Sequence, residues 1–144
     1  MRPVREAAAN VEKIMKVAEA EGVDFVLNAR TDAFHLGRDR DPADNLAEAV
    51  ERGKAFLDAG APVVFVPGRL SEEQVVTLVD AFGPQRLTLI GIPGVPPLAR
   101  LEELGVARVS YGPMSQNVAL TALQELAEDV QRGGGVPPTM RLLN

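Results

Sequence analysis

Residues 52–68 read RGKAFLDAGAPVVFVPG, and this stretch decides the fold because it joins the end of a helix to a short strand. Apolar residues recur at helical spacing up to Leu57, and Gly60 ends the helix, as glycine commonly does. Residues 63–66, VVFV, are apolar at successive positions. Such a strand is covered on both faces, which is typical of parallel sheets. The stretch therefore predicts one helix–turn–strand unit of an α/β protein.

The same alternation of helix and strand extends in both directions along the chain. Four strands are predicted, at residues 24–30, 63–66, 86–92 and 107–111. Five helices are predicted, at residues 4–21, 41–59, 71–83, 96–104 and 114–132. Strands that alternate with helices imply right-handed crossovers and a parallel sheet. Residues 1–132 are interpreted as one domain, and the Gly- and Pro-rich residues 133–144 as a flexible tail.

Two architectures fit this order of elements. A small doubly wound sheet can be complete in 144 residues. A (β/α)₈ barrel of the TIM type needs roughly 200 to 250 residues, so this chain would supply only part of one. The chain opens on a helix, as though a strand preceded it, which favours the partial barrel. The periodicity of the sequence leaves both alternatives open.

Composition excludes several classes of protein. The net charge is −5, so the sequence lacks the basic surface that binds nucleic acid or an anionic membrane. There are no cysteines, which removes disulfides and thiolate metal sites and is typical of a cytoplasmic protein. No apolar run reaches transmembrane length. One well-placed arginine can still bind a small anion.

Four polar residues gather where the first predicted strand ends, namely Asn28, Arg30, Thr31 and Asp32. Ligands of α/β sheets bind at this carboxyl edge of the strands. Alternation along the strand places Asn28 and Arg30 on one face, where a guanidinium can bind a carboxylate or phosphonate through two hydrogen bonds. In the alternative interpretation, Arg30 pairs with Asp32 and only stabilises the rim of the sheet.

Two weaker candidates follow in the neighbouring loops. Gly91 and Gly94 lie after the third predicted strand, where the backbone can approach an anion, although a Gly-Pro pair also marks a tight turn. His35 is the only histidine, and one histidine cannot build a histidine-based metal site. We interpret it as a solvated residue of a charged, mobile loop at residues 31–40, which can also gate a site.

The segment NARTDAF, residues 28–34, resembles the ARTD-type segment of the isocitrate lyase/phosphoenolpyruvate mutase superfamily. Residues 52–68 are similar to that family's helix, turn and following strand. Residues 87–113, LTLIGIPGVPPLARLEELGVARVSYGP, are similar to its last two barrel strands and the helix between them. The resemblance covers almost the whole chain and implies strands five to eight of a (β/α)₈ barrel.

The resemblance implies part of a Mg²⁺-dependent enzyme that acts on small 2-oxo or 2-hydroxy carboxylates or phosphonates, as a carbon–carbon lyase or phosphonomutase. The family's arginine that contacts the anionic substrate matches Arg30. Its acidic metal ligands lie on the early strands and its catalytic cysteine follows the fourth. No catalytic residue and no metal ligand is therefore assigned in this chain, which is expected to be inactive alone.

Two departures from the family pattern bear on the substrate. Lyase members tend to carry a Glu where this chain reads FVPG at residues 65–68, and an Asn where it reads IGIPG at residues 90–94. Isocitrate and methylisocitrate are therefore not expected as substrates. The sequence looks closer to the bacterial members often labelled phosphonomutase-like.

A half barrel exposes two sheet edges and an apolar inner surface, and unpaired edges favour association. We therefore expect a homo-oligomer whose partners otherwise are small anions. The alternative function is a non-enzymatic half barrel that self-associates as a structural or anion-binding module. The helix at residues 114–132 matches one that commonly swaps between subunits in the family, although it can equally cover its own sheet.

Overall fold

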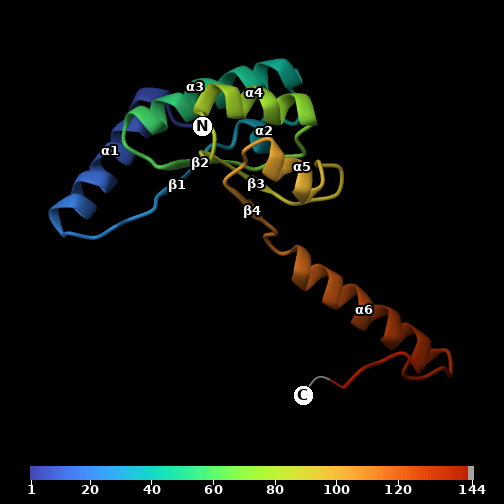
Figure 1. The fold of residues 1–144 in the computed structure, drawn as a ribbon. Coiled ribbons are helices and arrows are strands. Elements are labelled where there is room, and N and C mark those ends of the chain that lie inside the picture. The colour runs from blue at the N-terminus through green and yellow to red at the C-terminus, as the bar shows by residue number, and fades with distance from the viewer. Residues whose placement is uncertain (143–144) are drawn as a thin grey trace. The chain divides into compact units, whose positions relative to one another are not determined.

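A computed structural model of the protein describes residues 1–142. The chain divides into two compact units, Met1–Ser110 and a second that begins at Tyr111. The first unit contains a four-stranded sheet and the helices around it (Figure 1). Its elements in chain order are α1 (Val4–Ala20), β1 (Asn28–Arg30), α2 (Ala33–Leu36), α3 (Pro42–Asp58), β2 (Val63–Val66), α4 (Glu72–Phe82), β3 (Leu87–Ile90), α5 (Leu98–Glu103) and β4 (Arg108–Ser110).

The sheet has the strand order β1-β2-β3-β4, and every neighbouring pair is parallel. A doubly wound sheet reverses its strand order at a switch point, whereas a barrel adds its strands in sequence. The doubly wound alternative is therefore wrong. The predicted α/β fold with four parallel strands of a partial barrel is confirmed.

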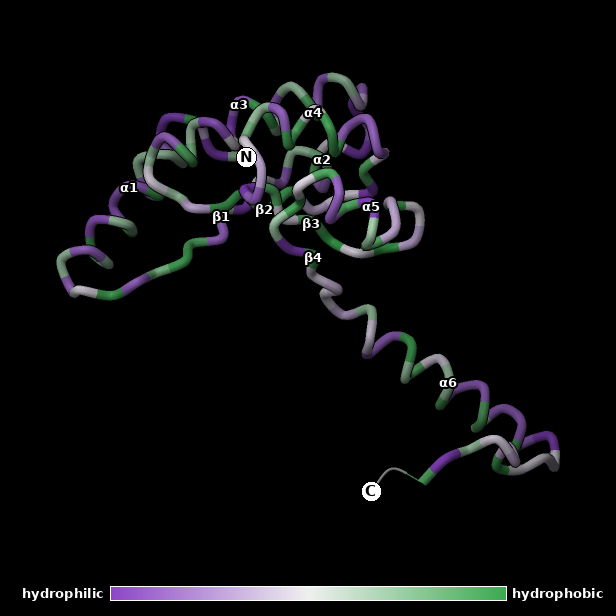
Figure 2. The backbone as a smooth tube through the Cα atoms, in the orientation of Figure 1, coloured by the Kyte–Doolittle hydropathy of each residue, from purple (hydrophilic) through white to green (hydrophobic). Residues whose placement is uncertain are grey.

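One face of the sheet forms the core of the first unit. Helices α1, α3 and α4 make a layer on one side of the strands (Figure 1). Hydrophilic and hydrophobic residues alternate along these helices (Figure 2), so each can turn an apolar stripe towards the sheet. The strand side chains on this face are almost fully buried: Ala29, Val64, Val66, Leu87 and Leu89.

The opposite face is open, and we call it the inner face. It carries Asn28, Arg30, Phe65, Thr88, Ile90 and Arg108, which the parallel register places on one side of the sheet. All of these except Thr88 are half-buried or exposed. The expectation that both faces of the VVFV strand are covered is therefore wrong within this chain, because only alternate residues of β2 are buried.

Two elements differ from the sequence predictions. The first strand pairs only over Asn28–Arg30, because its neighbour β2 begins at Val63 and offers no partner to residues 24–27. The predicted loop at residues 31–40 contains the short helix α2, so the described part of the chain has six helices and not five. This helix forms because Ala33 is fully buried and Phe34 packs against the core.

The predicted helix starts at α3 and α4 are confirmed. The Asp41 side chain accepts a hydrogen bond from the Ala43 amide, and Pro42 occupies the first turn of α3. Ser71 and Gln74 form a complete capping box at α4. These caps fix where α3 and α4 begin, directly behind the loops that follow β1 and β2.

The second unit contains α6 (Met114–Gln131), and none of its residues is buried. The chain after α6 forms turns without a helix or strand as far as residue 142. The predicted boundary at residue 132, and the packing of α6 on a neighbour or on its own sheet, stay predictions. Within residues 1–142, no helix combines the length and apolar character needed to cross a membrane.

Candidate functional site

Arg30 ends β1 on the inner face, as the alternation of the strand predicts. Its Nε and Nη2 atoms lie 2.7 Å and 2.6 Å from Oδ1 of Asp32. Its Cζ atom lies 5.9 Å from the centre of the Phe65 ring, which is the neighbouring residue across the sheet. The side chain remains 49% exposed. Asp32 thus holds one edge of the guanidinium, and the edge formed by Nη1 and Nη2 stays open.

Asn28 and Thr88 form a polar pair next to Arg30. The Thr88 hydroxyl lies 2.8 Å from Asn28 Oδ1 and 3.2 Å from the Val64 carbonyl oxygen, so one proton serves two acceptors. Thr88 is only 2% exposed and fixes the Asn28 amide. The Asn28 Nδ2 group has no partner in residues 1–142, so it is available as a neutral donor. Sequence analysis missed Thr88, whose signal is one polar residue inside the apolar strand LTLI.

Thr31 differs from the other predicted residues at this strand end. It is 2% exposed, its amide donates to the Phe65 carbonyl at 3.0 Å, and its hydroxyl oxygen lies 3.4 Å from the Ala33 amide. These contacts place it on the helix-covered side, at the start of α2. Asn28, Arg30 and Asp32 therefore come together near the inner face, while Thr31 supports the turn behind them.

Gly91 and Gly94 follow β3 as predicted, and each has a clear structural role. The Gly91 amide donates to the Ser110 carbonyl at 2.7 Å, which extends the pairing of β3 with β4. Gly94 has a φ of +97°, and a Cβ atom there would lie 3.1 Å from Cδ of Arg69. The tight-turn interpretation accounts for Gly94, and its missing side chain lets Arg69 approach. Their predicted contact with an anion stays a prediction.

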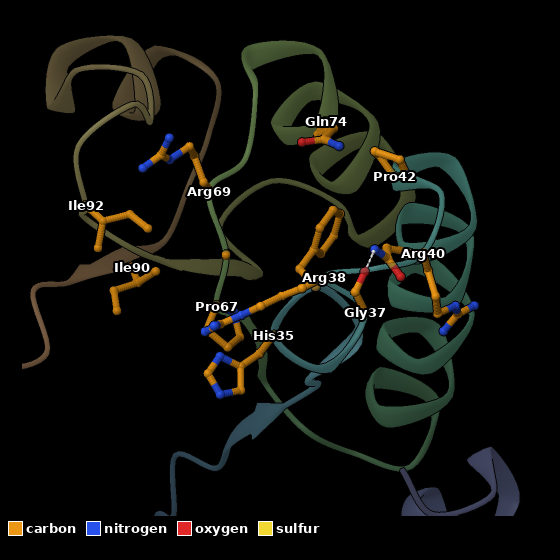
Figure 3. Close-up of a pocket in the computed structure, with 13 residues that line it drawn as sticks. His35, Gly37, Arg38, Arg40, Pro42, Pro67, Arg69, Gln74, Ile90 and Ile92 are labelled. Carbon is orange, nitrogen blue, oxygen red and sulfur yellow. Dashed lines mark hydrogen bonds between the residues drawn. The ribbon is translucent and has the colours of Figure 1, made fainter.

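A cleft of about 600 Å³ opens among the loops that follow β1, β2 and β3, and we call it the loop cleft (Figure 3). Four basic side chains line it, and no acidic residue does: His35, Arg38, Arg40 and Arg69. Apolar residues complete the walls: Phe34, Pro42, Pro67, Ile90 and Ile92. The loop that contains His35 thus borders a cavity, although the six predicted site residues are not among its lining.

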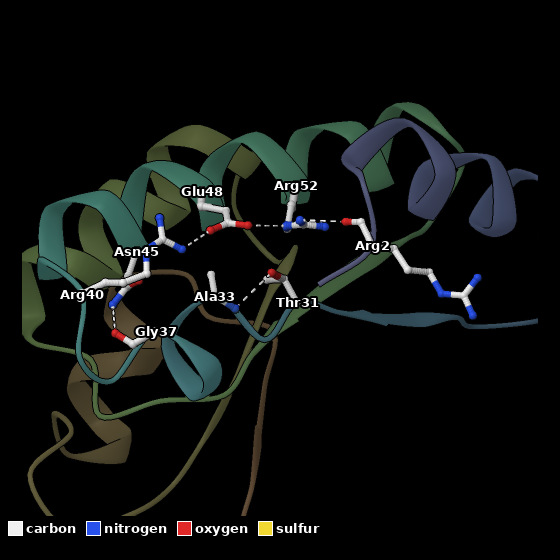
Figure 4. Close-up of polar contacts among 8 residues, drawn as sticks. All are labelled: Arg2, Thr31, Ala33, Gly37, Arg40, Asn45, Glu48 and Arg52. Atoms are coloured by element: carbon white, nitrogen blue, oxygen red, sulfur yellow. Dashed lines mark hydrogen bonds and ion pairs between the residues drawn. The ribbon is translucent and has the colours of Figure 1, made fainter.

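The basic residues of the loop cleft differ in their partners. Arg40 turns away from the cleft and pairs with Glu48 of α3 (Figures 3 and 4). The hydrogen bond from Arg40, followed by the one from Arg52, holds the pKa of the Glu48 carboxyl below its ordinary value. Arg38 and Arg69 form no ion pair within the described part of the chain. The loop cleft is therefore locally positive, although the protein carries a net charge of −5.

Asn45 closes the loop cleft from the first turns of α3. Its Nδ2 group donates to the Gly37 carbonyl at 2.6 Å (Figure 4), which fixes the orientation of the amide. Its Oδ1 atom is buried and has no hydrogen-bond partner in residues 1–142. A buried polar atom without a partner costs about 1–3 kcal/mol, and this one faces Gly37, where an added Cβ atom would overlap it.

Comparisons with known proteins place this geometry in a family. The family model for phosphoenolpyruvate phosphomutase matches residues 1–131. An uncharacterized protein of Mycobacterium tuberculosis is 33% identical over 132 residues, which are 92% of this chain and 48% of that protein. The phosphonopyruvate hydrolase of a Variovorax species is 27% identical over 144 residues, and the match spans 92% of this chain and 47% of that protein.

Solved structures agree with these relatives. A candidate phosphonomutase from Burkholderia cenocepacia matches with a TM-score of 0.75 and 36% identity, over 93% of this chain and 52% of that one. A 2,3-dimethylmalate lyase of the superfamily, at 23% identity and a TM-score of 0.77, shows the same fold. The chain spans about half the length of the relatives that it matches.

Proposed function

Because the chain belongs to the phosphoenolpyruvate phosphomutase family, we propose that it is part of an enzyme that acts on small 2-oxo or 2-hydroxy carboxylates or phosphonates. The reaction is of the carbon–carbon lyase or phosphonomutase type. Two relatives support this range: the Variovorax protein is named for phosphonopyruvate, and a protein of Eubacterium barkeri, 30% identical over 129 residues, for 2,3-dimethylmalate. Both compounds are small organic anions.

The position of Arg30 carries the proposal. Asp32 engages the edge of the guanidinium formed by Nε and Nη2, so the second edge can take a carboxylate or phosphonate through two parallel hydrogen bonds. Asn28 offers a neutral donor from the same face. Phe65 supports the guanidinium from the neighbouring strand. These residues bind and orient an anion without taking part in bond breaking.

A divalent metal, Mg²⁺ by resemblance to the family, supplies the Lewis acid in this proposal. Mg²⁺ binds through one or two carboxylates together with substrate oxygens and water. Residues 1–142 contain no group of three or more His, Cys, Asp or Glu side chains placed to hold a metal ion, and Asp32 is already paired with Arg30. Among the described residues, no cluster of side chains by itself supports a site for the metal. We propose that its ligands lie in a part of the enzyme outside this chain.

The test combines this chain with the missing part of a relative. The half of the Variovorax hydrolase that this chain does not match is produced separately, and each piece and their mixture are assayed with phosphonopyruvate and Mg²⁺. We expect turnover only from the mixture, lost in Arg30→Ala and retained in Arg86→Ala. Arg86 is a matched control, since it is exposed at the amino end of β3.

Two outcomes would contradict the proposal. Turnover by the purified chain alone would show that its own residues hold the metal. Turnover in the mixture that survives Arg30→Ala would remove the role of Arg30. Because halves of distant relatives can fail to assemble, binding of phosphonopyruvate to the chain alone, followed by NMR shifts, gives a second measurement of the same arginine.

A second function, a self-associating anion-binding module, is favoured by the exposed apolar surface. Phe65 and Ile90 are only half-buried on the inner face, and Val23, Phe25 and Val26 are exposed before β1. Association of two copies would cover such surfaces. Light scattering tests this function, since a monomer at high concentration would exclude it.

A further inference from the structure

We propose that two copies of this four-stranded chain join edge to edge into one closed eight-stranded barrel, in which β1 of each copy pairs with β4 of the other. The sheet has two free edges, because β1 pairs only with β2, and β4 only with β3, within residues 1–142. The strands are parallel and follow one another in sequence order, so one two-fold axis along the barrel brings both pairs of edges together. The inference rests on the self-association proposed above and specifies the surfaces that form it.

The segment before β1 has the form of a strand without a partner. Residues 23–27 contain no helix, turn or bend and lead directly into β1 (Figure 1). The backbone of residues 24–26 forms no hydrogen bond within residues 1–142, because β2 begins at Val63, opposite Asn28. An extended, unpaired backbone that continues an edge strand can accept a further strand.

Alternation along this segment decides which side chains face the inside of the barrel. Phe25 lines an apolar groove with Ile14 of α1, and Leu27 packs against the core. Both side chains therefore lie on the helix-covered side, and the alternate positions, Asp24 and Val26, turn to the inner face. Asp24 is exposed and forms no ion pair within residues 1–142. The free edge at β1 thus carries a carboxylate on its inner side.

The other free edge carries the opposite charge. Arg108 is the first residue of β4, lies on the inner face and forms no ion pair within residues 1–142. The second arginine of the inner face, Arg30, is already paired with Asp32 of its own copy. Arg108 is therefore the charge that needs a partner when the barrel closes, and Asp24 of the other copy supplies the carboxylate.

The stagger of the sheet brings these two residues together. A row across the sheet begins at Arg30, the last residue of β1, and ends at Arg108, the first residue of β4. The register of an eight-stranded barrel of this kind shifts by about eight residues in a full turn, and so by about four over half of one. Because the row runs from the end of one strand to the beginning of another, it continues to an earlier residue of β1 in the other copy, close to Val26. Asp24 is the next inner-facing residue there, within reach of the long Arg108 side chain.

Charge exchange between Asp24 and Arg108 tests this pairing. Analytical ultracentrifugation of the purified chain over a range of concentrations should show a dimer. Asp24→Arg and Arg108→Asp should each weaken dimerisation by about tenfold or more, because each places like charges at both contacts. An equimolar mixture of the two variants should dimerise as the wild type does, because every arginine of the mixed dimer again meets a carboxylate. Glu51→Arg, exposed on α3, is the control and should leave the dissociation constant unchanged.

Hydrogen exchange gives a second measurement on the wild-type chain. The amides of residues 24–26 should exchange rapidly at concentrations where the chain is monomeric, and should become protected in the dimer. Circular dichroism checks that the variants fold, and the side chains of Asp24 and Arg108 are exposed, so their exchange leaves the core intact.

The outcomes separate this inference from the proposed functions. A dimer that neither charge reversal weakens would overturn the edge-to-edge pairing and leave self-association to another surface, and a mixture that fails to recover the dimer would also overturn the pairing. A monomer at all concentrations would overturn both. A monomer that forms a one-to-one complex with the unmatched half of the Variovorax hydrolase would assign the free edges to that polypeptide. Recovery of the dimer in the mixture would support the barrel of two copies, whatever the outcome of the turnover assay.

Discussion

Replacing Gly53 by alanine sets helix propensity against packing, and the structure decides which effect is larger. Gly53 lies inside α3, where alanine is favoured over glycine by about 1 kcal/mol. A Cβ atom at this position would overlap the Phe82 ring of α4, and even the third-nearest ring atom, Cε2, would lie at 3.1 Å. Propensity predicts stabilisation, and packing predicts the opposite.

The burial of Phe82 sets the cost of the clash. The ring is 5% exposed, so it can escape the new methyl group only by leaving the contact between α3 and α4. Losing the burial of a phenylalanine side chain costs about 1.5–3 kcal/mol, and overpacking a core costs about 1–3 kcal/mol. After the gain in propensity is subtracted, we expect Gly53→Ala to lower the free energy of unfolding by about 1–2 kcal/mol.

Urea unfolding followed by circular dichroism measures this change. The adjacent, exposed Lys54→Ala is the control and should shift the free energy by less than about 0.5 kcal/mol. Shortening the ring in Gly53→Ala/Phe82→Leu should recover part of the loss, because both residues share one contact. A single Gly53→Ala variant as stable as the parent would refute the reasoning, since it would mean that Phe82 can relax without cost.

Three further predictions concern the polar contacts. Ser71→Ala removes the capping box of α4 and should lower the free energy of unfolding by about 1 kcal/mol, measured by urea titration. Arg52 is only 6% exposed, and its guanidinium donates at 2.9 Å to both Glu48 and the Arg2 carbonyl (Figure 4). Arg52→Met removes these bonds and should lower the free energy of unfolding by about 1–3 kcal/mol, measured by thermal unfolding. The lowered pKa of Glu48 means that its stabilisation is present above the ordinary glutamate value of 4.5 and is lost as the pH falls below it. Urea titrations across this range should show a weaker pH dependence in Arg40→Met, and an unchanged dependence would contradict the assigned cause.

Local signals in the sequence predicted most of the fold. Pro42 and the Ser71 capping box act within one helical turn, so the starts of α3 and α4 were predictable. The extent of β1 was not, because it depends on where β2 begins. Helix α2 was missed because its four residues are too few to show a period, and it exists through the burial of Ala33.

The sequence predicted the candidate site only where its residues lie close together in the chain. Arg30 and Asp32 are two residues apart, so the pattern NARTD placed both at one strand end. Thr88 contacts Asn28 across 60 residues of sequence, and no local pattern announces that pairing. Arg69 enters the loop cleft because Gly94 leaves room for it, which depends on the packing of two loops. Contacts between residues that are so far apart in the sequence depend on the tertiary structure alone.

The register of the sheet limits which polypeptide can cover its inner face. Arg30, Phe65, Thr88 and Arg108 form one row across the inner face, and Arg108 forms no ion pair within residues 1–142. Covering this row with protein would bury an unpaired positive charge in a medium of low polarity, which costs several kcal/mol. Any polypeptide that completes the interior must therefore bring a negative group to the level of Arg108, or leave a water-filled channel beside it.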